Sequence, residues 1–285
     1  MKLMNKDKMF DHIIKYKHAS EYYLNIDNWQ DYIDYWTSDD KIVFSCNYIE
    51  PLPFVFEDSY SYTSVVFSRL SMLKSMIGHE NNKLFCGQKS NFNQEINNLP
   101  KGIKELLLSD YFDKNLDNLP NLTHLTILGK FNNPINNLPL TLLFLRFADS
   151  KFNNPIDLLP SDLKILVLDC NQFNQSFDNL PSSLELLDIN GYNNTMQINN
   201  LPQGLKNLYL RTNLIEIVHY DYPLIQLPDS IEYLFLSNCF NAELIMPKKI
   251  KVVYVGGKIY RNYDVIDYND KLCYNYSYFF NFFQN

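Results

Sequence analysis

The dipeptide Leu-Pro recurs along the chain at nearly constant intervals, and this periodicity constrains the fold more than any other feature. The prolines of these dipeptides are Pro100, Pro120, Pro139, Pro160, Pro181, Pro202 and Pro228, and a Met-Pro pair continues the series at Pro247. The intervals between them are 20, 19, 21, 21, 21, 26 and 19 residues. Each proline is followed by the same apolar pattern LxxLxL, from Ile103-Leu106-Leu108 to Ile250-Val253-Val255. A unit of this length cannot bury its own apolar face and becomes stable by stacking on its neighbours. The repeats therefore predict a solenoid.

The spacing within each apolar triplet indicates a short strand. Its last two apolar residues lie two positions apart, so their side chains point to the same side of an extended segment. The proline before each triplet fixes φ and lacks an N–H group, which excludes a central helix just ahead of the strand. A repeat of about 20 residues leaves little room for a helix elsewhere. The sequence predicts a mostly β, leucine-rich-repeat-like solenoid of short parallel strands, joined by extended or 3₁₀ segments.

Asparagine recurs at two fixed positions of the repeat. One group follows an aromatic residue and the other precedes Leu-Pro, at Asn93, Asn132, Asn153 and Asn174, and at Asn98, Asn118, Asn137, Asn179 and Asn200. Turns in a stacked structure leave backbone groups that need partners. A short amide side chain can bond the turn above or below it. We therefore expect structural asparagine ladders rather than a ligand site.

The repeated text resembles the FNIP repeat, a relative of the leucine-rich repeat found in social amoebae and in giant viruses that infect amoebae. The matching motifs are FNxPI, NNLP and LxxLxL, and they are most complete at Phe131–Phe147 and Phe152–Leu168. The resemblance covers about Asn91 to Gly257, and the spacing is also similar to short bacterial leucine-rich repeats that carry LPxxLxxL. It implies a curved solenoid that serves protein–protein contact.

The same resemblance implies an alternative function. Some family members carry an F-box ahead of the repeats and look like substrate adaptors of cullin-type ubiquitin ligases. Residues 1–40 contain spaced Ile and Leu without the Leu-Pro that opens the F-box pattern. A divergent F-box in this segment is the second functional hypothesis, and an enzyme activity within residues 1–90 is the third.

Composition and spacing suggest four segments. Residues 1–40 form a helical N-terminal cap made of two amphipathic helices, and residues 91–258 hold the regular repeats. Between them, residues 41–90 contain the β-rich stretches KIVFS, TSVVF and KLFC at the repeat interval, which indicates degenerate repeats. A small separate α+β domain ending near Ser90 is the alternative. Residues 259–285 are rich in Tyr and Phe and form an aromatic C-terminal cap, with a disordered partner-binding tail as the other interpretation.

Outward-facing positions on the strands indicate the binding surface. Residues between the buried positions of each triplet form two columns on the outer side of the predicted sheet, and from Phe144 onward they are largely apolar or aromatic. Such a strip commonly marks a contact site. The candidate partner-binding residues are Phe144, Ile165, Val167, Leu186, Tyr209, Tyr233, Phe235, Val252 and Tyr254. Two competing explanations are that one end of the chain folds over this face, or that aromatic residues are simply abundant throughout.

The remaining features argue against other classes of protein. The net charge is −7 without a stripe of Lys and Arg, so nucleic acid is not the expected partner. No signal peptide, long apolar run, CxxC pair, HExxH motif or glycine-rich phosphate loop is present. We therefore expect a cytoplasmic monomer that is not an enzyme, does not bind a membrane, holds no metal or cofactor, and binds a protein partner.

Overall fold

The computed structural model describes residues 91–255, except 98, 100, 109, 191–197, 212–221, 238–239 and 241, together with the strands at the two ends of the chain. Apart from those strands, the helical cap expected in residues 1–40, the degenerate repeats in 41–90 and the aromatic cap in 259–285 lie outside the described residues. The Asn98 position of the second asparagine group lies outside them too.

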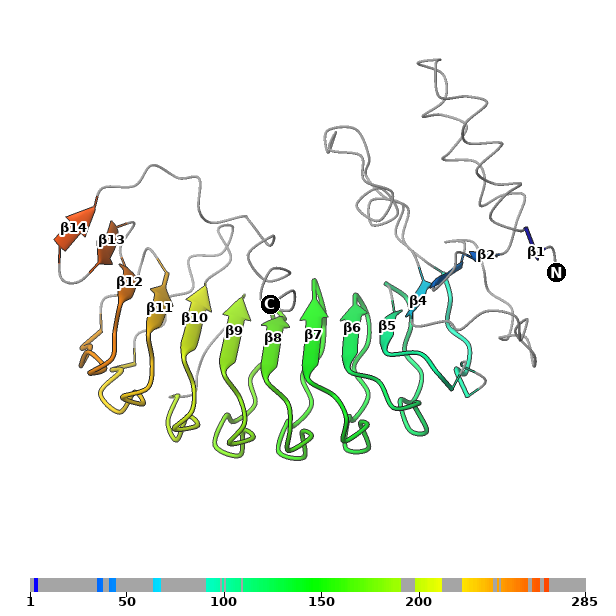
Figure 1. Ribbon diagram of the computed structural model, residues 1–285, viewed down its shortest axis with the longest axis horizontal. Coiled ribbons are helices and arrows are strands. Elements are labelled where there is room, and N and C mark those ends of the chain that lie inside the picture. Colours follow the sequence, from blue (N-terminus) through cyan, green and yellow to red (C-terminus); the bar gives the residue numbers. More distant parts are fainter. Residues whose placement is uncertain are drawn as a thin grey trace, which may run out of the picture.

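Within the described part of the chain, fourteen strands form one sheet in which spatial order equals sequence order (Figure 1). They are β1 (Leu3–Met4), β2 (Tyr35–Thr37), β3 (Lys41–Phe44), β4 (Ser64–Phe67), β5 (Glu105–Leu108), β6 (His124–Leu128), β7 (Phe144–Ala148), β8 (Ile165–Asp169), β9 (Leu186–Asn190), β10 (Asn207–Arg211), β11 (Tyr233–Leu236), β12 (Val252–Val255), β13 (Lys258–Arg261) and β14 (Asp264–Ile266). Pairing is parallel from β3 to β12. It is antiparallel between β2 and β3 and from β12 through β14.

One strand per repeat, paired in parallel with the strands before and after it, is the architecture of a leucine-rich-repeat-like solenoid. The described residues of the repeats contain no helix; turns and extended segments connect the strands. The predicted fold class is therefore confirmed. Of the three β-rich stretches ahead of the regular repeats, two form β3 and β4, while the third, at 83–86, lies outside the described residues.

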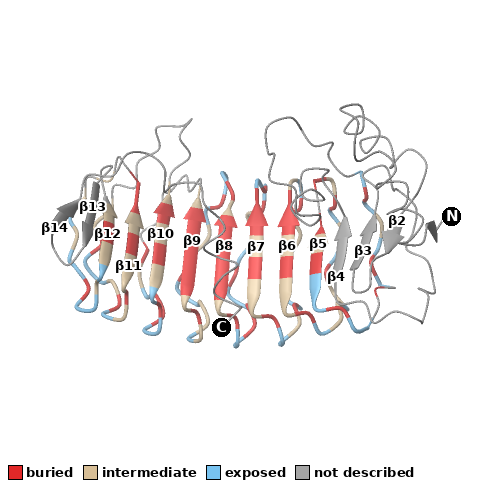
Figure 2. Ribbon diagram, turned by 45° about the horizontal axis from the view of Figure 1, so that its top comes forward, coloured by how far each residue is buried: buried red, intermediate tan, exposed pale blue. Residues whose placement is uncertain are grey.

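Two rows of side chains make the core. The apolar triplets supply the first row, which is buried from Ile103 to Leu236, as in Leu125 and Leu145. Figure 2 shows this burial continuing across the central strands of the sheet. Phenylalanines from the FNxPI segments supply the second row, and each ring stacks on the next with centroids 6.1 to 6.3 Å apart: Phe92, Phe112, Phe131, Phe152 and Phe173. These five rings are fully buried. The hydrophobic core is thus continuous from repeat to repeat.

A recurrent turn explains why Leu-Pro and the triplet keep a fixed separation. In six repeats the proline carbonyl accepts a hydrogen bond from the backbone N–H of the first triplet residue, three positions on, at 3.0 Å for Pro139 and Leu142 and 3.1 Å for Pro160 and Leu163. The same bond recurs after Pro181, Pro202, Pro228 and Pro247. After Pro120 the donor is the N–H of Leu122, two positions on, at 2.7 Å. The proline therefore sets the entry to the strands from β6 to β12.

The first asparagine group forms the expected ladder. The backbone N–H of Asn153 donates to Oδ1 of Asn132, and the N–H of Asn174 donates to Oδ1 of Asn153, both at 2.8 Å. Asp113 occupies the same position one repeat earlier and accepts from the Asn132 N–H at 3.1 Å. The prediction of a structural ladder is confirmed for this group.

The second group bonds differently from the predicted pattern. Asn137, Asn179 and Asn200 each donate Nδ2 to an aspartate carboxylate one repeat earlier, over 2.7 to 3.0 Å, and not to the backbone of the turn. Asn118 and Asn200 have φ of 67° and 54°. Asparagine tolerates this left-handed conformation better than most residues. The repeated asparagine therefore serves both the turn and the contact between turns.

Replacing Asn153 with Ala should lower the free energy of unfolding by about 1 kcal/mol, because two bonds across the turn are lost at a half-buried position. Asn153 accepts from the Asn174 N–H and from Nε2 of Gln175, the latter at 3.2 Å. Asn153→Asp is the matched control, since Asp113 fills the same position of its own repeat. Urea denaturation of both variants tests this, and equal losses would contradict the role assigned to the acceptor oxygen.

Candidate partner-binding face

The side of the sheet opposite the core carries two columns of residues, which we call the outer sheet face. In register from β5 to β12, the first column is Glu105, His124, Phe144, Ile165, Leu186, Asn207, Tyr233 and Val252, and the second is Leu107, Thr126, Arg146, Val167, Asp188, Tyr209, Phe235 and Tyr254. All nine candidate residues from the sequence lie on this face. The parallel pairing has no register shift between these strands, so they form neighbouring rows of one surface.

The centre of this face is more buried than an exposed strip would be. Ile165, Val167 and Leu186 keep only 6, 4 and 7% of their surface exposed and form an apolar cluster separate from the core. The larger rings of Phe144 and Tyr209 pack against the cluster from the neighbouring strands. Figure 2 shows the burial of β8 and β9 extending along most of each strand. The available apolar surface therefore lies mainly on the two flanks of the cluster.

Aromatic rings line the flank toward the C-terminal end. Tyr209, Phe235 and Tyr254 stack in sequence, with centroids 4.5 and 6.2 Å apart and interplanar angles of 8° and 24°. All three are half-buried. Burial raises the pKa of Tyr209 to about 12, and the nearby carboxylate of Asp188 adds to the rise. These rings, which we call the aromatic ladder, present faces and edges rather than ionised groups.

On the other flank, the ring of His124 stacks on Phe144 with centroids 5.6 Å apart. Burial lowers the pKa of His124, and the charge of Glu105 opposes that shift only in part. The neutral imidazole is therefore favoured, and it extends the apolar surface beyond Phe144. The ring of His124 is half-buried.

A buried ion pair lies where the apolar cluster meets the aromatic ladder, since Asp188 stands between Val167 and Tyr209 in the second column. Asp188 has 0% of its surface exposed, and Nε of Arg211 donates to its Oδ1 at 2.9 Å, with a second bond from Nη2 to Oδ2. Burial raises the pKa of Asp188, and the charge of Arg211 opposes the rise. The periodic pattern of the repeats does not predict this pair. The available signal was that Arg211 lies on the same side of its strand as Tyr209, the register neighbour of Asp188.

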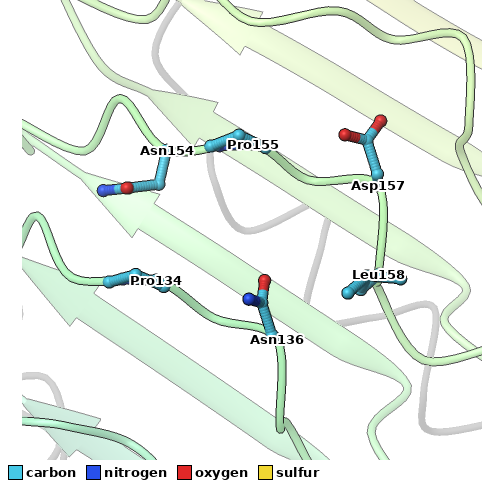
Figure 3. Close-up of a pocket in the computed structure, with 6 residues that line it drawn as sticks. All are labelled: Pro134, Asn136, Asn154, Pro155, Asp157 and Leu158. Carbon is cyan, nitrogen blue, oxygen red and sulfur yellow. The ribbon is translucent and has the colours of Figure 1, made fainter.

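The described residues offer little that could perform catalysis. They contain no group of three or more His, Cys, Asp or Glu side chains placed to hold a metal ion. Cys170 is buried, and burial raises the pKa of its thiol, which opposes a nucleophilic role. A depression of about 440 Å³ lies between two FNxPI turns, away from the outer sheet face (Figure 3). Its lining residues are Pro134, Asn136, Asn154, Pro155, Asp157 and Leu158. Asp157 is the single titratable residue among those that line the depression, so they do not supply an acid–base pair.

The fold and this face define a leucine-rich-repeat-like solenoid with one broad apolar surface. No family model matches the chain, and no curated protein matches it. Among solved structures, it is similar to CroV588, a circular leucine-rich-repeat protein from a giant virus, with 26% identity and a TM-score of 0.48. That match covers 72% of this chain and 35% of CroV588, so the chain spans about a third of that protein's length. No helix within the described ranges is long and apolar enough to cross a membrane.

Proposed function

We propose that this protein is a protein–protein interaction module that binds its partner through the outer sheet face. The observation that supports this best is the continuity of the surface: apolar and aromatic residues occupy neighbouring rows from β7 to β12. Solenoids use extended surfaces of this kind for binding. Aromatic residues are also enriched at the cores of protein interfaces.

The proposed surface has a rigid centre and accessible flanks. Ile165, Val167 and Leu186 are already packed, so they support the surface more than they contact a partner. Tyr233, Phe235 and Tyr254 are half-buried, so part of each ring stays accessible, and they lie on strands that pair with a neighbour on both sides. Amphipathic rings with few rotatable bonds lose little conformational entropy when they are covered. We therefore assign most of the binding energy to this flank.

The alternative function, a cullin-ligase adaptor with an F-box at 1–40, depends on residues that lie outside the described part of the chain except for strands β1 and β2. An enzyme within residues 1–90 depends largely on the same segment. Neither hypothesis gains support from a described contact, and the interaction module is the function that we put forward.

A selection from a phage-displayed peptide library tests the surface even while the natural partner is unidentified. Peptides selected on the full chain should bind a Tyr233→Lys, Phe235→Lys variant at least about tenfold more weakly, because two charges would be placed at the core of the interface. The matched control is Leu140→Lys, Leu158→Lys, which changes two exposed leucines on the turns. Circular dichroism should show equal β content in both variants.

The control variant should keep its affinity for the selected peptides. Peptides that bind the outer-face variant as tightly as the unmodified chain would show that this surface is not where the protein binds. Peptides that bind the Leu140→Lys, Leu158→Lys variant weakly instead would show that the binding site lies on the turns.

A further inference from the structure

The accessible flank of the outer sheet face exposes apolar surface to water in the free protein, which is unfavourable. Tyr209, Phe235 and Tyr254 are stacked and half-buried, and Tyr233 and Val252 lie beside them in the first column. Apolar patches that remain open to water favour association or coverage by another segment. The described strands do not supply such a segment, since all of them belong to the same sheet.

The chain itself contains a segment with suitable chemistry. Residues 267–285 follow the last described strand directly and contain eight Phe and Tyr among nineteen residues. Tyr274, Tyr276 and Tyr278 alternate with small polar residues. In an extended conformation, such alternation places the three rings on one side. A segment with one aromatic side can cover an aromatic surface while its polar side remains in water.

We propose that residues 267–285, which lie outside the described residues, occupy the outer sheet face of the same chain until a partner displaces them. The proposal rests on the function proposed above only in treating this face as the binding surface. The segment acts as an internal competitor: it shields the aromatic ladder in the free protein and reduces the apparent affinity for any partner. The occupant is part of this chain rather than a second copy.

The geometry of the sheet allows this contact. β14 ends at Ile266, four strands from β10 and six from β8 in the order of the sheet. Neighbouring strands lie about 4.8 Å apart, so the far end of the aromatic ladder, at Tyr209 on β10, lies within roughly 20 Å and the apolar cluster lies within roughly 30 Å. Nineteen extended residues reach up to about 60 Å. The segment can therefore cross the ladder and still turn onto the face.

Chemical crosslinking of the full chain tests this contact directly, because the segment carries a native thiol at Cys273. Asn207→Cys places a second thiol on the outer sheet face, at a half-exposed position that leaves the aromatic ladder intact. After treatment with a short bismaleimide, mass spectrometry identifies which thiols are linked. We expect an intramolecular link between Cys273 and the thiol introduced by Asn207→Cys.

A matched control uses Leu158→Cys, an exposed position on the turns. The link from Cys273 to the thiol of Asn207→Cys should form in about tenfold or higher yield than the link to the thiol of Leu158→Cys. A docked segment has a higher effective concentration at the surface that it occupies than at a surface that it does not contact. Adding Tyr274→Ser, Tyr276→Ser and Tyr278→Ser should reduce the yield to the level of the control, because the rings supply the contact.

Three outcomes would overturn the proposal: equal yields from the two positions, no link at the outer sheet face, or a link that joins two chains. The last would identify a second copy as the occupant. None of these measurements involves a partner, so they can fail while peptide binding at Tyr233 and Phe235 succeeds. Conversely, if the selected peptides bind the Tyr233→Lys, Phe235→Lys variant normally, the proposed function fails, but the expected crosslink between Cys273 and the outer sheet face is unaffected.

Discussion

Arg211→Met should lower the free energy of unfolding by about 3–5 kcal/mol, since it leaves a charge buried without its partner. Asp188 is fully buried between the apolar cluster and the aromatic ladder, and Arg211 supplies two hydrogen bonds to its carboxylate. The side chain of Arg211 itself keeps 28% of its surface exposed, so the cost falls on Asp188. Urea denaturation at neutral pH, followed by circular dichroism, measures the loss.

Two control variants separate the buried pair from ordinary surface charge. Asp188→Asn combined with Arg211→Met removes both charges of the pair and should recover most of the stability, because no carboxylate is left buried without its partner at this position. Lys206→Met breaks an ion pair with Glu185 of 2.7 Å in which both partners are well exposed. Its cost should not exceed about 1 kcal/mol. A loss for Arg211→Met no larger than for Lys206→Met would contradict the importance of burial.

The fold was predictable because the residues that determine the structure of each repeat lie within that repeat. A proline that fixes the strand entry and a triplet with alternating apolar residues recur in every regular repeat, and an asparagine or aspartate that bonds the next turn recurs in most of them. Local determinants of this kind do not require knowledge of distant contacts. The register of Leu125 opposite Leu145 follows directly from aligning the repeats. The same alignment assigns Tyr209 and Phe235 to one column.

What the sequence did not predict depends on neighbours in space. Aligning the repeats shows that Ile165 and Leu186 face outward, but it does not show that they are buried and that Phe144 and Tyr209 pack against them. The bond from Arg211 to Asp188 runs diagonally between strands, two positions away from the register neighbour. No periodic pattern encodes a single diagonal pair. The aspartate partners of the second asparagine group are likewise visible only once the turns are stacked.

Phe152→Ala should lower the free energy of unfolding by about 3–5 kcal/mol, because removing a fully buried ring leaves a cavity as well as losing its transfer energy. The ring stacks on Phe147 with centroids 4.1 Å apart and stands between Phe131 and Phe173 in the second row of the core. Each repeat is stabilised mainly by its immediate neighbours. A cavity in the middle of the stack therefore weakens two interfaces at once, and distant repeats cannot compensate.

Leu158→Ala in the same repeat is the matched control, since this leucine is 63% exposed on the turn. Truncating an exposed side chain away from special backbone features should change stability by no more than about 0.5 kcal/mol. Thermal and urea unfolding of both variants measure the difference. If the two substitutions cost the same, the phenylalanine row does not couple the repeats, and the stack must then depend on the strand ladder and the asparagine bonds.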